Sequence, residues 1–296
     1  MRGRHLARDL VRKSGGLRIA VAILAAAFGL ALFGCQSSSL FGGSDAGRPA
    51  AHSANSLPAI LERGELRVAM SGDLPPLNMK NKQGEIIGLE VDLVSALAHA
   101  MGLEVRIVET PFSELIPTLE RGDVDLVISG MTMTPERNAR VAFVGPYFIS
   151  GTSILTKSED IASEEEPANL DGPSRKFAAL AGSTSAMFVK EVMPQSKLVT
   201  TESYDDAVAM VINDEVDGLV ADFQVCILST WRFADAGLMA VRTPFTVEPL
   251  GIALPPDEPL LHNLVSNYLN TLEDTGLLAQ LKAKWLSDGS WLSELP

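Results

Sequence analysis

Residues 129–137, with the sequence SGMTMTPER, carry groups that could bind an anion. Thr134 is a good N-cap residue and Pro135 a good first-turn residue, so a short helix is expected to begin here. The start of a helix points backbone N–H groups outward, which favours a negatively charged ligand. Arg137 adds a planar guanidinium that can bind a carboxylate through two parallel hydrogen bonds.

Two neighbours of Arg137 support the interpretation as an anion site. Gly130 lacks a side chain and allows close approach of the backbone, and the Thr132 hydroxyl can donate or accept a hydrogen bond. A structural alternative stays open, because Arg137 could instead pair with a nearby acid such as Glu136 or Asp125.

The elements that must position this segment alternate between strand and helix. Residues 91–101, for example, have apolar side chains at helical spacing, whereas the flanking apolar runs are short and strand-like. This alternation predicts βαβ units and a mostly parallel sheet. The expected elements are strands at 65–70, 105–108 and 124–128, the last reaching Gly130, and helices at 91–101 and 115–119.

A second set of elements begins near residue 177 and predicts a second α/β lobe. Both sets share a local pattern, GDVD before LVISG at 122–130 and EVD before GLVAD at 215–222. Each pattern puts polar groups at the carboxyl end of a buried strand, where open α/β sheets bind ligands. The second set is expected to have strands near 177, at 197–201 and at 218–221, and helices at 204–212 and from 223.

The tail of the chain, residues 259–286, predicts two helices broken at Gly276. The second of these helices carries Leu281 and Trp285. The apolar side of the first is expected to consist of Leu260, Leu261, Leu264, Val265, Tyr268 and Leu272.

Composition places the chain among ordinary globular proteins. It has 296 residues, of which 46% are hydrophobic and 21% charged, and this excludes collagen-like, disordered and disulfide-framework proteins. Without its first 34 residues the chain keeps 18 basic and 36 acidic side chains, a formal charge of −18. So acidic a body is a poor partner for nucleic acid or an anionic lipid surface.

The N-terminus predicts export and lipid attachment. Six basic residues precede an uncharged apolar run at 19–32, which is the pattern of a signal peptide covering residues 1–34. The run ends in LFGC, which resembles a bacterial lipobox with Cys35 as the lipidated first residue of the mature protein. An uncleaved short anchor or a soluble secreted form is the alternative. Residues 36–56, rich in Ser, Gly and Ala, are expected to form a flexible tether, so that Cys35 and this stretch hold the globular body near a membrane.

Little else in the sequence could do chemistry. If Cys35 carries lipid, Cys226 is the one remaining thiol, so no internal disulfide is expected, and its apolar neighbours predict a small buried side chain. His99 and His262 fall within helical patterns, so no general base at a strand end, metal site or cofactor is expected.

Beyond these patterns, the chain resembles the bacterial extracellular solute-binding proteins of the polar amino-acid type, family 3. The resemblance covers about residues 57–290 and is specific because several short motifs occur in one order. These motifs are GELRV (64–68), LPPL (74–77), GLEVDL (88–93), LIP (115–117), GDVD (122–125), TPER (134–137), PYF (146–148), GST (182–184), DGLVAD (217–222) and GIA (251–253).

The resemblance implies a binding site for the two charged ends of an amino acid. Asp222 would take the α-ammonium group, which agrees with the need of a zwitterion for a cation at one end of its site and an anion at the other. The α-carboxylate site carried over from the family consists of Arg137, Thr132, Ser129 and Gly130 from one lobe and Ser183 and Thr184 from the other.

The side-chain pocket departs from the family pattern. Phe112 matches an aromatic residue that packs against the ligand, although an aromatic before a helix is also often core. The family often has a second aromatic where this chain has Leu74 and an acid where it has Ser71. The missing acid weakens the case for a cationic ligand, whereas nearby Asp73 keeps arginine or lysine open.

The implied fold is the type II periplasmic-binding-protein fold, with two α/β lobes joined by two hinge strands and a cleft between them. Lobe one would be residues 57–150 plus 248–296 and lobe two residues 152–245. The implied function is a monomeric, lipid-anchored receptor on the periplasmic side of a bacterial membrane that delivers an amino acid to an ABC transporter permease. A ligand-sensing subunit for a membrane signalling protein stays open, as does an enzyme resembling cyclohexadienyl dehydratase, for which Asp222 or Glu248 would be a guess as the acid.

Overall fold

The computed structural model describes residues 55–287 and 289–295. The predicted signal peptide, Cys35 and nearly all of the predicted tether lie outside the described residues. None of the helices in these two described ranges combines the length and the apolar character needed to cross a membrane.

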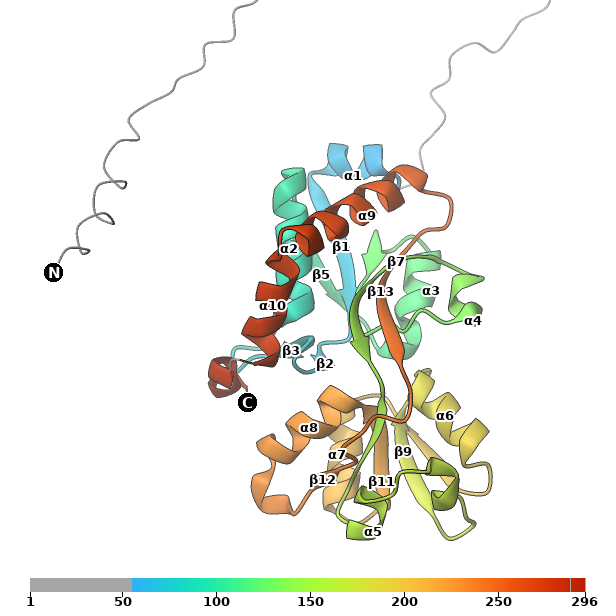
Figure 1. Ribbon diagram of the computed structural model, residues 1–296. Coiled ribbons are helices and arrows are strands. Elements are labelled where there is room, and N and C mark those ends of the chain that lie inside the picture. The colour runs from blue at the N-terminus through green and yellow to red at the C-terminus, as the bar shows by residue number, and fades with distance from the viewer. Residues whose placement is uncertain (1–54, 288, 296) are drawn as a thin grey trace, which may run out of the picture. The chain divides into compact units, whose positions relative to one another are not determined.

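The first sheet has five strands in the order β5-β1-β6-β13-β7. β13 pairs antiparallel with both of its neighbours, so it runs against the other four strands. In Figure 1, α2, α9 and α10 lie on one side of this sheet, and α3 and α4 lie on the other. The strands are β1 (Glu65–Met70), β5 (Glu104–Glu109), β6 (Leu126–Val127), β7 (Ala142–Ser150) and β13 (Glu248–Leu254), and the helices are α1 (Leu57–Arg63), α2 (Leu89–Met101), η1 (Phe112–Glu114), α3 (Leu115–Glu120), α4 (Pro135–Asn138), α9 (Pro259–Asp274), α10 (Leu277–Leu286) and η4 (Gly289–Glu294).

The second sheet has five strands in the order β10-β9-β11-β8-β12, and here β8 alone among the five runs against the others. Each sheet therefore consists mainly of parallel strands and contains one antiparallel strand, β13 or β8, which belongs to a connection between the lobes. Its strands are β8 (Thr152–Thr156), β9 (Lys176–Leu180), β10 (Lys197–Thr201), β11 (Gly218–Asp222) and β12 (Met239–Ala240), with helices α5 (Glu159–Ala162), η2 (Pro167–Leu170), α6 (Thr184–Val192), α7 (Tyr204–Ile212), α8 (Phe223–Arg232) and η3 (Ala234–Ala236).

Two connections join the sheets. β7 continues through Gly151 into β8, and the chain returns from β12 to β13 alongside it. The two connections touch, because the Phe245 N–H donates to the Thr152 carbonyl at 2.8 Å. A Cβ atom at Gly151 would lie 2.3 Å from the carbonyl oxygen of Thr246, so only glycine lets the connections approach this closely.

A small antiparallel sheet, which the sequence patterns did not predict, follows β1. Its strands are β2 (Asp73–Leu74), β3 (Asn78–Lys80) and β4 (Ile86–Ile87). Strands of two or three residues give too little alternation of apolar and polar residues to be recognised. Asp73 is the first residue of this sheet.

Most predicted elements of the two lobes are confirmed within one or two residues, and α7 matches its predicted bounds. Two expectations were wrong. The strand expected at 124–128 is shorter, because only Leu126–Val127 form a β-strand. The flanking residues Val124, Asp125 and Ile128 are fully buried but lie outside the strand. Leu260, expected on the apolar side of α9, is 62% exposed, because the buried stripe of α9 consists of Leu261, Val265, Leu269 and Leu272.

The repeated pattern of the two lobes has a structural counterpart. Asp125 accepts the backbone N–H of Arg67 at 2.7 Å, and Asp217 accepts the backbone N–H of Lys176 at 2.7 Å. Each aspartate precedes a strand, β6 or β11, and ties its start to the neighbouring parallel strand, β1 or β9. Charged acceptors make such hydrogen bonds stronger than neutral ones. The predicted burial of Cys226 is confirmed, since its side chain is 0% exposed.

Candidate functional site

Arg137 lies where the lobes meet. Thr134 caps α4 as predicted, because its hydroxyl accepts the Arg137 N–H at 3.3 Å. The guanidinium donates from Nη1 to the Thr132 carbonyl at 2.9 Å and from Nη2 to the Gly182 carbonyl of the other lobe at 3.1 Å. α4 has only four residues, so its dipole is small and the attraction for an anion comes from the Arg137 charge.

Arg137 has an environment that keeps its guanidinium in place. Its Cζ atom lies 5.6 Å from the centroid of the Phe112 ring, within the range of a cation–π interaction. Burial lowers the pKa of Arg137, and the carboxylates of Glu248 and Asp222 oppose this shift. Phe112 is 8% exposed, so the ring predicted to pack against the ligand packs against the guanidinium in this structure.

The alternative that Arg137 pairs with Asp125 was wrong. Asp125 is completely buried and forms ion pairs with Arg63 and Arg67, at 2.9 Å to the second. The guanidinium of Arg137 donates instead to the two backbone carbonyls of Thr132 and Gly182.

Asp222 ends β11 and precedes α8, at the carboxyl end of its strand as predicted. Its Oδ1 accepts from the Ser150 hydroxyl at 2.5 Å and its Oδ2 from the Tyr204 hydroxyl at 3.3 Å. Burial raises the pKa of Asp222 to about 6. The Arg137 charge lowers the pKa of Asp222 and the Asp222 charge raises that of Arg137, although burial outweighs both effects.

Glu248 stands at the centre of a hydroxyl cluster. Its Oε2 accepts from Thr132 at 2.7 Å and from Thr184 at 2.6 Å, and its Oε1 accepts from Thr152 at 2.7 Å and from Thr246 at 3.1 Å. Burial raises the pKa of Glu248, but the four hydrogen bonds together outweigh burial and the net shift is downward. The side-chain hydroxyls predicted for the ligand carboxylate are therefore shared with a carboxylate of the protein.

Three other predicted residues use their polar groups within the fold. The Ser129 hydroxyl accepts the Ser71 N–H at 2.9 Å, and the Gly130 N–H donates to Glu90 at 2.7 Å. The Ser183 hydroxyl caps the first turn of α6. These hydrogen bonds fix the turns that precede Arg137 and Thr184. Direct contact of the three residues with a ligand stays a prediction.

Leu74 has a packing role in this structure. It is 2% exposed, and a Cβ atom at Gly130 would lie 2.1 Å from its Cδ2 atom. Gly130 also has φ +59°, which favours glycine. Leu74 therefore fills the space that a side chain at position 130 would occupy.

Sequence reasoning missed Glu90, which holds the Gly130 turn. Its carboxyl group is fully buried, contacts Tyr147, and accepts from Asn78 at 2.5 Å and from Gly130 at 2.7 Å. Burial raises the pKa of Glu90 to about 7. The only sequence signal was an acid following an apolar residue at the start of α2, which is also a common helix-start pattern.

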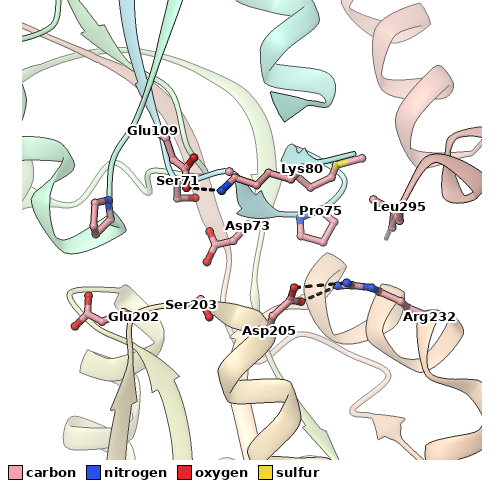
Figure 2. A pocket seen from close by; sticks show the side chains of 13 residues that line it. Ser71, Asp73, Pro75, Lys80, Glu109, Glu202, Ser203, Asp205, Arg232 and Leu295 are labelled. Atoms are coloured by element: carbon pink, nitrogen blue, oxygen red, sulfur yellow. Dashed lines mark hydrogen bonds and ion pairs between the residues drawn. The ribbon is translucent and has the colours of Figure 1, made fainter. Parts of the chain in front are cut away.

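A cavity of about 580 Å³ is lined by Ser71 but by none of the other predicted ligand residues (Figure 2). Ser71 and Asp73 line it from one lobe, and Ser203 lines it from the other. Asp73 accepts the Tyr204 N–H through Oδ2 at 3.1 Å, and burial raises the pKa of Asp73.

A second, apolar cavity of about 280 Å³ lies between α8 and the C-terminal elements. It is lined by Trp231 of α8, by Trp285 of α10 and by Trp291 of η4, which are all three tryptophans of the chain. Within the two described ranges, no group of three or more His, Cys, Asp or Glu side chains could hold a metal ion.

The family model of the bacterial extracellular solute-binding proteins, family 3, matches residues 66–288. The chain belongs to this family. Among its relatives, the ABC transporter arginine-binding protein 1 of Escherichia coli (strain K12) is 28% identical over 75% of this chain and 90% of its own length. The cyclohexadienyl dehydratase of Pseudomonas aeruginosa is 24% identical over 78% of this chain and 85% of its own length.

Solved structures of this family share the fold. A lysine complex from Wolinella succinogenes DSM 1740, described as a binding component of an ABC transporter, superposes with a TM-score of 0.74. It is 33% identical and covers 78% of this chain and 99% of its own. The type II periplasmic-binding-protein fold predicted from the sequence is thereby confirmed.

Proposed function

We propose that this family 3 protein is the extracytoplasmic amino-acid-binding component of an ABC importer. The observation that carries the proposal is the family match over residues 66–288, together with one cation, Arg137, and one acid, Asp222, that come from different lobes and shift each other's pKa. A free amino acid presents one carboxylate and one ammonium group, and these two side chains complement both. Each charge-assisted hydrogen bond contributes roughly 1.5–3 kcal/mol.

Binding is proposed to work by closing the lobes, with lobe one at residues 57–150 plus 248–296 and lobe two at 152–245. A ligand held by Arg137 and Asp222 at once gains contacts that an open arrangement lacks, so it shifts the population toward the closed one. The lobes are joined by only two chain segments, β7–β8 and β12–β13, and a hinge motion at such segments needs few changes in backbone dihedral angles. The permease would then respond to the closed form.

The membrane attachment is a further part of the proposal. The LFGC motif supports lipidation of Cys35, and the stretch at 36–56 would let the body reach a permease from its anchor. A single acyl chain holds a protein only marginally, so a lipoprotein-type modification with more than one chain fits a lasting anchor.

The test is a binding screen with purified protein. Melting temperatures are measured with each of the twenty amino acids, and calorimetry follows for those that raise the value, because a ligand that binds only the folded state stabilises it. One or a few amino acids are expected to bind. If none of the twenty changes the melting temperature or gives heat, the proposed function is wrong.

An enzyme on this fold is the second candidate, and the similarity to a cyclohexadienyl dehydratase favours it. A cation at Arg137 and an acid at Asp222 suit holding a zwitterion, so we expect no turnover. Mass spectrometry after incubation with a cyclohexadienyl acid tests this, since loss of water from the substrate would establish the enzyme.

A further inference from the structure

One carboxylate oxygen of Glu248 joins the two lobes. Its Oε2 accepts from the Thr132 hydroxyl, in the segment before α4, at 2.7 Å and from the Thr184 hydroxyl at 2.6 Å. Thr184 is the first residue of α6 in the other lobe, and the two hydroxyl oxygens lie 3.5 Å apart. An ionised acceptor makes such hydrogen bonds stronger than a neutral one would. A single atom of Glu248 therefore holds one residue of each lobe.

The other oxygen of Glu248 holds the two connections between the lobes. Oε1 accepts from Thr152, which follows Gly151 in the first connection, at 2.7 Å and from Thr246 in the second at 3.1 Å. The two connections are also bonded to each other here, because the Thr152 N–H donates to the Thr246 hydroxyl at 2.9 Å. Both threonines belong to the segments about which the lobes would rotate, so a hinge motion moves them little relative to Glu248.

Thr184 has a different position with respect to the hinge. It is fixed on α6, because the Ser183 hydroxyl caps this helix by accepting the Ala186 N–H at 3.1 Å. Since α6 moves with its lobe, separation of the lobes must break the bond from Thr184 to Glu248, whereas the three other bonds of Glu248 can persist. An interaction made in only one of two arrangements shifts the equilibrium toward that arrangement.

Two further hydrogen bonds cross between the lobes, from Arg137 to the Gly182 carbonyl and from the Tyr204 N–H to Asp73, each at 3.1 Å. Each of them uses a backbone group. The bond from Thr184 to Glu248 is shorter and joins two side chains, so a substitution can remove it without changing the backbone. A hydroxyl has one proton, so Thr184 cannot donate to Glu248 and to a ligand carboxylate at once.

We propose that Glu248 is a positioning residue for lobe closing, and that its bond with Thr184 is a latch that populates the closed arrangement before any ligand binds. The latch should raise the ratio of closed to open molecules about ten- to a hundredfold, which is the range for one hydrogen bond to a charged group. Because a ligand held by both lobes binds the closed arrangement, losing the latch should lower the affinity for every amino acid by up to the same factor. The inference goes beyond the proposed function, since it concerns the hinge and does not depend on which amino acid binds.

The first test measures the closing equilibrium without ligand. Nitroxide labels are attached to Ala139→Cys, directly after α4, and to Lys190→Cys on α6, two exposed positions on different lobes. α4 and α6 lie on the same side of the connections (Figure 1). The full-length chain carries Cys35→Ser, and Cys226 is fully buried, so only the introduced cysteines react. Double electron–electron resonance then gives the distribution of distances between the lobes.

The labelled parent should show a short-distance component, and Thr184→Val should reduce the closed-to-open ratio about ten- to a hundredfold because valine keeps the shape and lacks the hydroxyl. Thr184→Ser keeps the hydroxyl and should restore the ratio. Thr246→Val is the matched control, since it removes a hydroxyl from the same carboxylate but from a connection, and it should change the ratio less than about threefold. A parent without short distances, an unchanged distribution in Thr184→Val, or an equal shift in Thr246→Val would overturn the latch.

The second test separates the latch from a direct ligand contact of Thr184. Calorimetry with arginine, histidine and glutamine as probes measures affinity in Thr184→Val, in Glu248→Gln and in the double variant. If Thr184 acts through Glu248, the two losses are not additive, and the double variant should bind within about threefold of the weaker single variant. Additive losses would mean that Thr184 contacts the ligand independently of Glu248, which overturns the assignment.

The outcomes distinguish a failure of the latch from a failure of the proposed function. If amino acids bind but Thr184→Val leaves the distances unchanged, the latch is wrong and the receptor stands. A lower melting temperature of Thr184→Val with unchanged distances would mean that the bond only stabilises the fold, which also overturns the latch. If no amino acid binds, the proposed function is wrong, and the distance measurements still decide whether the latch exists.

Discussion

Replacing Asp222 with asparagine should stabilise the ligand-free protein while it abolishes tight ligand binding. Burial raises the pKa of Asp222 from 3.8 to about 6, so the folded state binds this proton more tightly than the unfolded state does. Stability contributed by this group therefore decreases as pH rises from about 4 to about 6, and stays lower above that range. Asparagine is neutral at every pH and keeps an oxygen that can accept from Ser150.

The size of the effect follows from the shift in the Asp222 pKa. A difference of about two pH units corresponds to roughly 3 kcal/mol at pH 8, which is an upper bound. Asp222 is only partly buried and loses some hydrogen bonding on substitution, so we expect a gain of about 1–2 kcal/mol at pH 8 and about zero at pH 4. Each kcal/mol corresponds to about 2–4 °C in melting temperature for a body of this size.

Thermal melts of ligand-free protein at pH 4 and pH 8 measure this difference, and calorimetry at pH 8 measures ligand affinity. Asp217→Asn is the matched control, because Asp217 accepts the Lys176 N–H and lies 3.7 Å from Arg175. That variant should be destabilised and should retain its affinity. If Asp222→Asn lowers the melting temperature at pH 8 or binds ligand normally, then the hypothesis is wrong that Asp222 is ionised in the ligand-free protein and binds the ammonium group of the ligand.

The remaining predictions concern the other parts of the receptor. Arg137→Ala should weaken ligand binding about ten- to a hundredfold with little change in folding, and unchanged affinity in calorimetry would remove Arg137 from the site. Affinity should fall about tenfold between pH 7.5 and pH 5, because Asp222, with a pKa of about 6, must be ionised to accept an ammonium group; a flat pH profile would contradict this. Saturating ligand should change the tryptophan emission, because all three tryptophans line a cavity shared by α8 and the C-terminal elements, and identical spectra with and without ligand would argue against lobe closure. Cys35→Ser should release the protein from membranes, and lipid still found on the variant would refute the anchor.

Local sequence determined the elements and the positions of the main charges. α7 was predictable because Ser203 caps it, with its hydroxyl accepting the Asp206 N–H at 3.1 Å, and because its buried residues recur at helical spacing. The Arg137 turn was predictable for a similar reason, since Thr134 and Pro135 act within one turn of chain. The placement of Asp222 followed from the end of an apolar strand.

Only the tertiary structure decided what surrounds those charges. Glu248 gathers hydroxyls from Thr132, Thr152, Thr184 and Thr246, of which the first lies 116 residues away in the chain. The hydrogen bond between Asp73 and Tyr204 and the packing of Leu74 on Gly130 likewise depend on contacts between segments distant in sequence. Hydrogen bonding and burial act over a few ångströms. The spacing of residues in the sequence shows which side chains lie that close only within a single helix or strand.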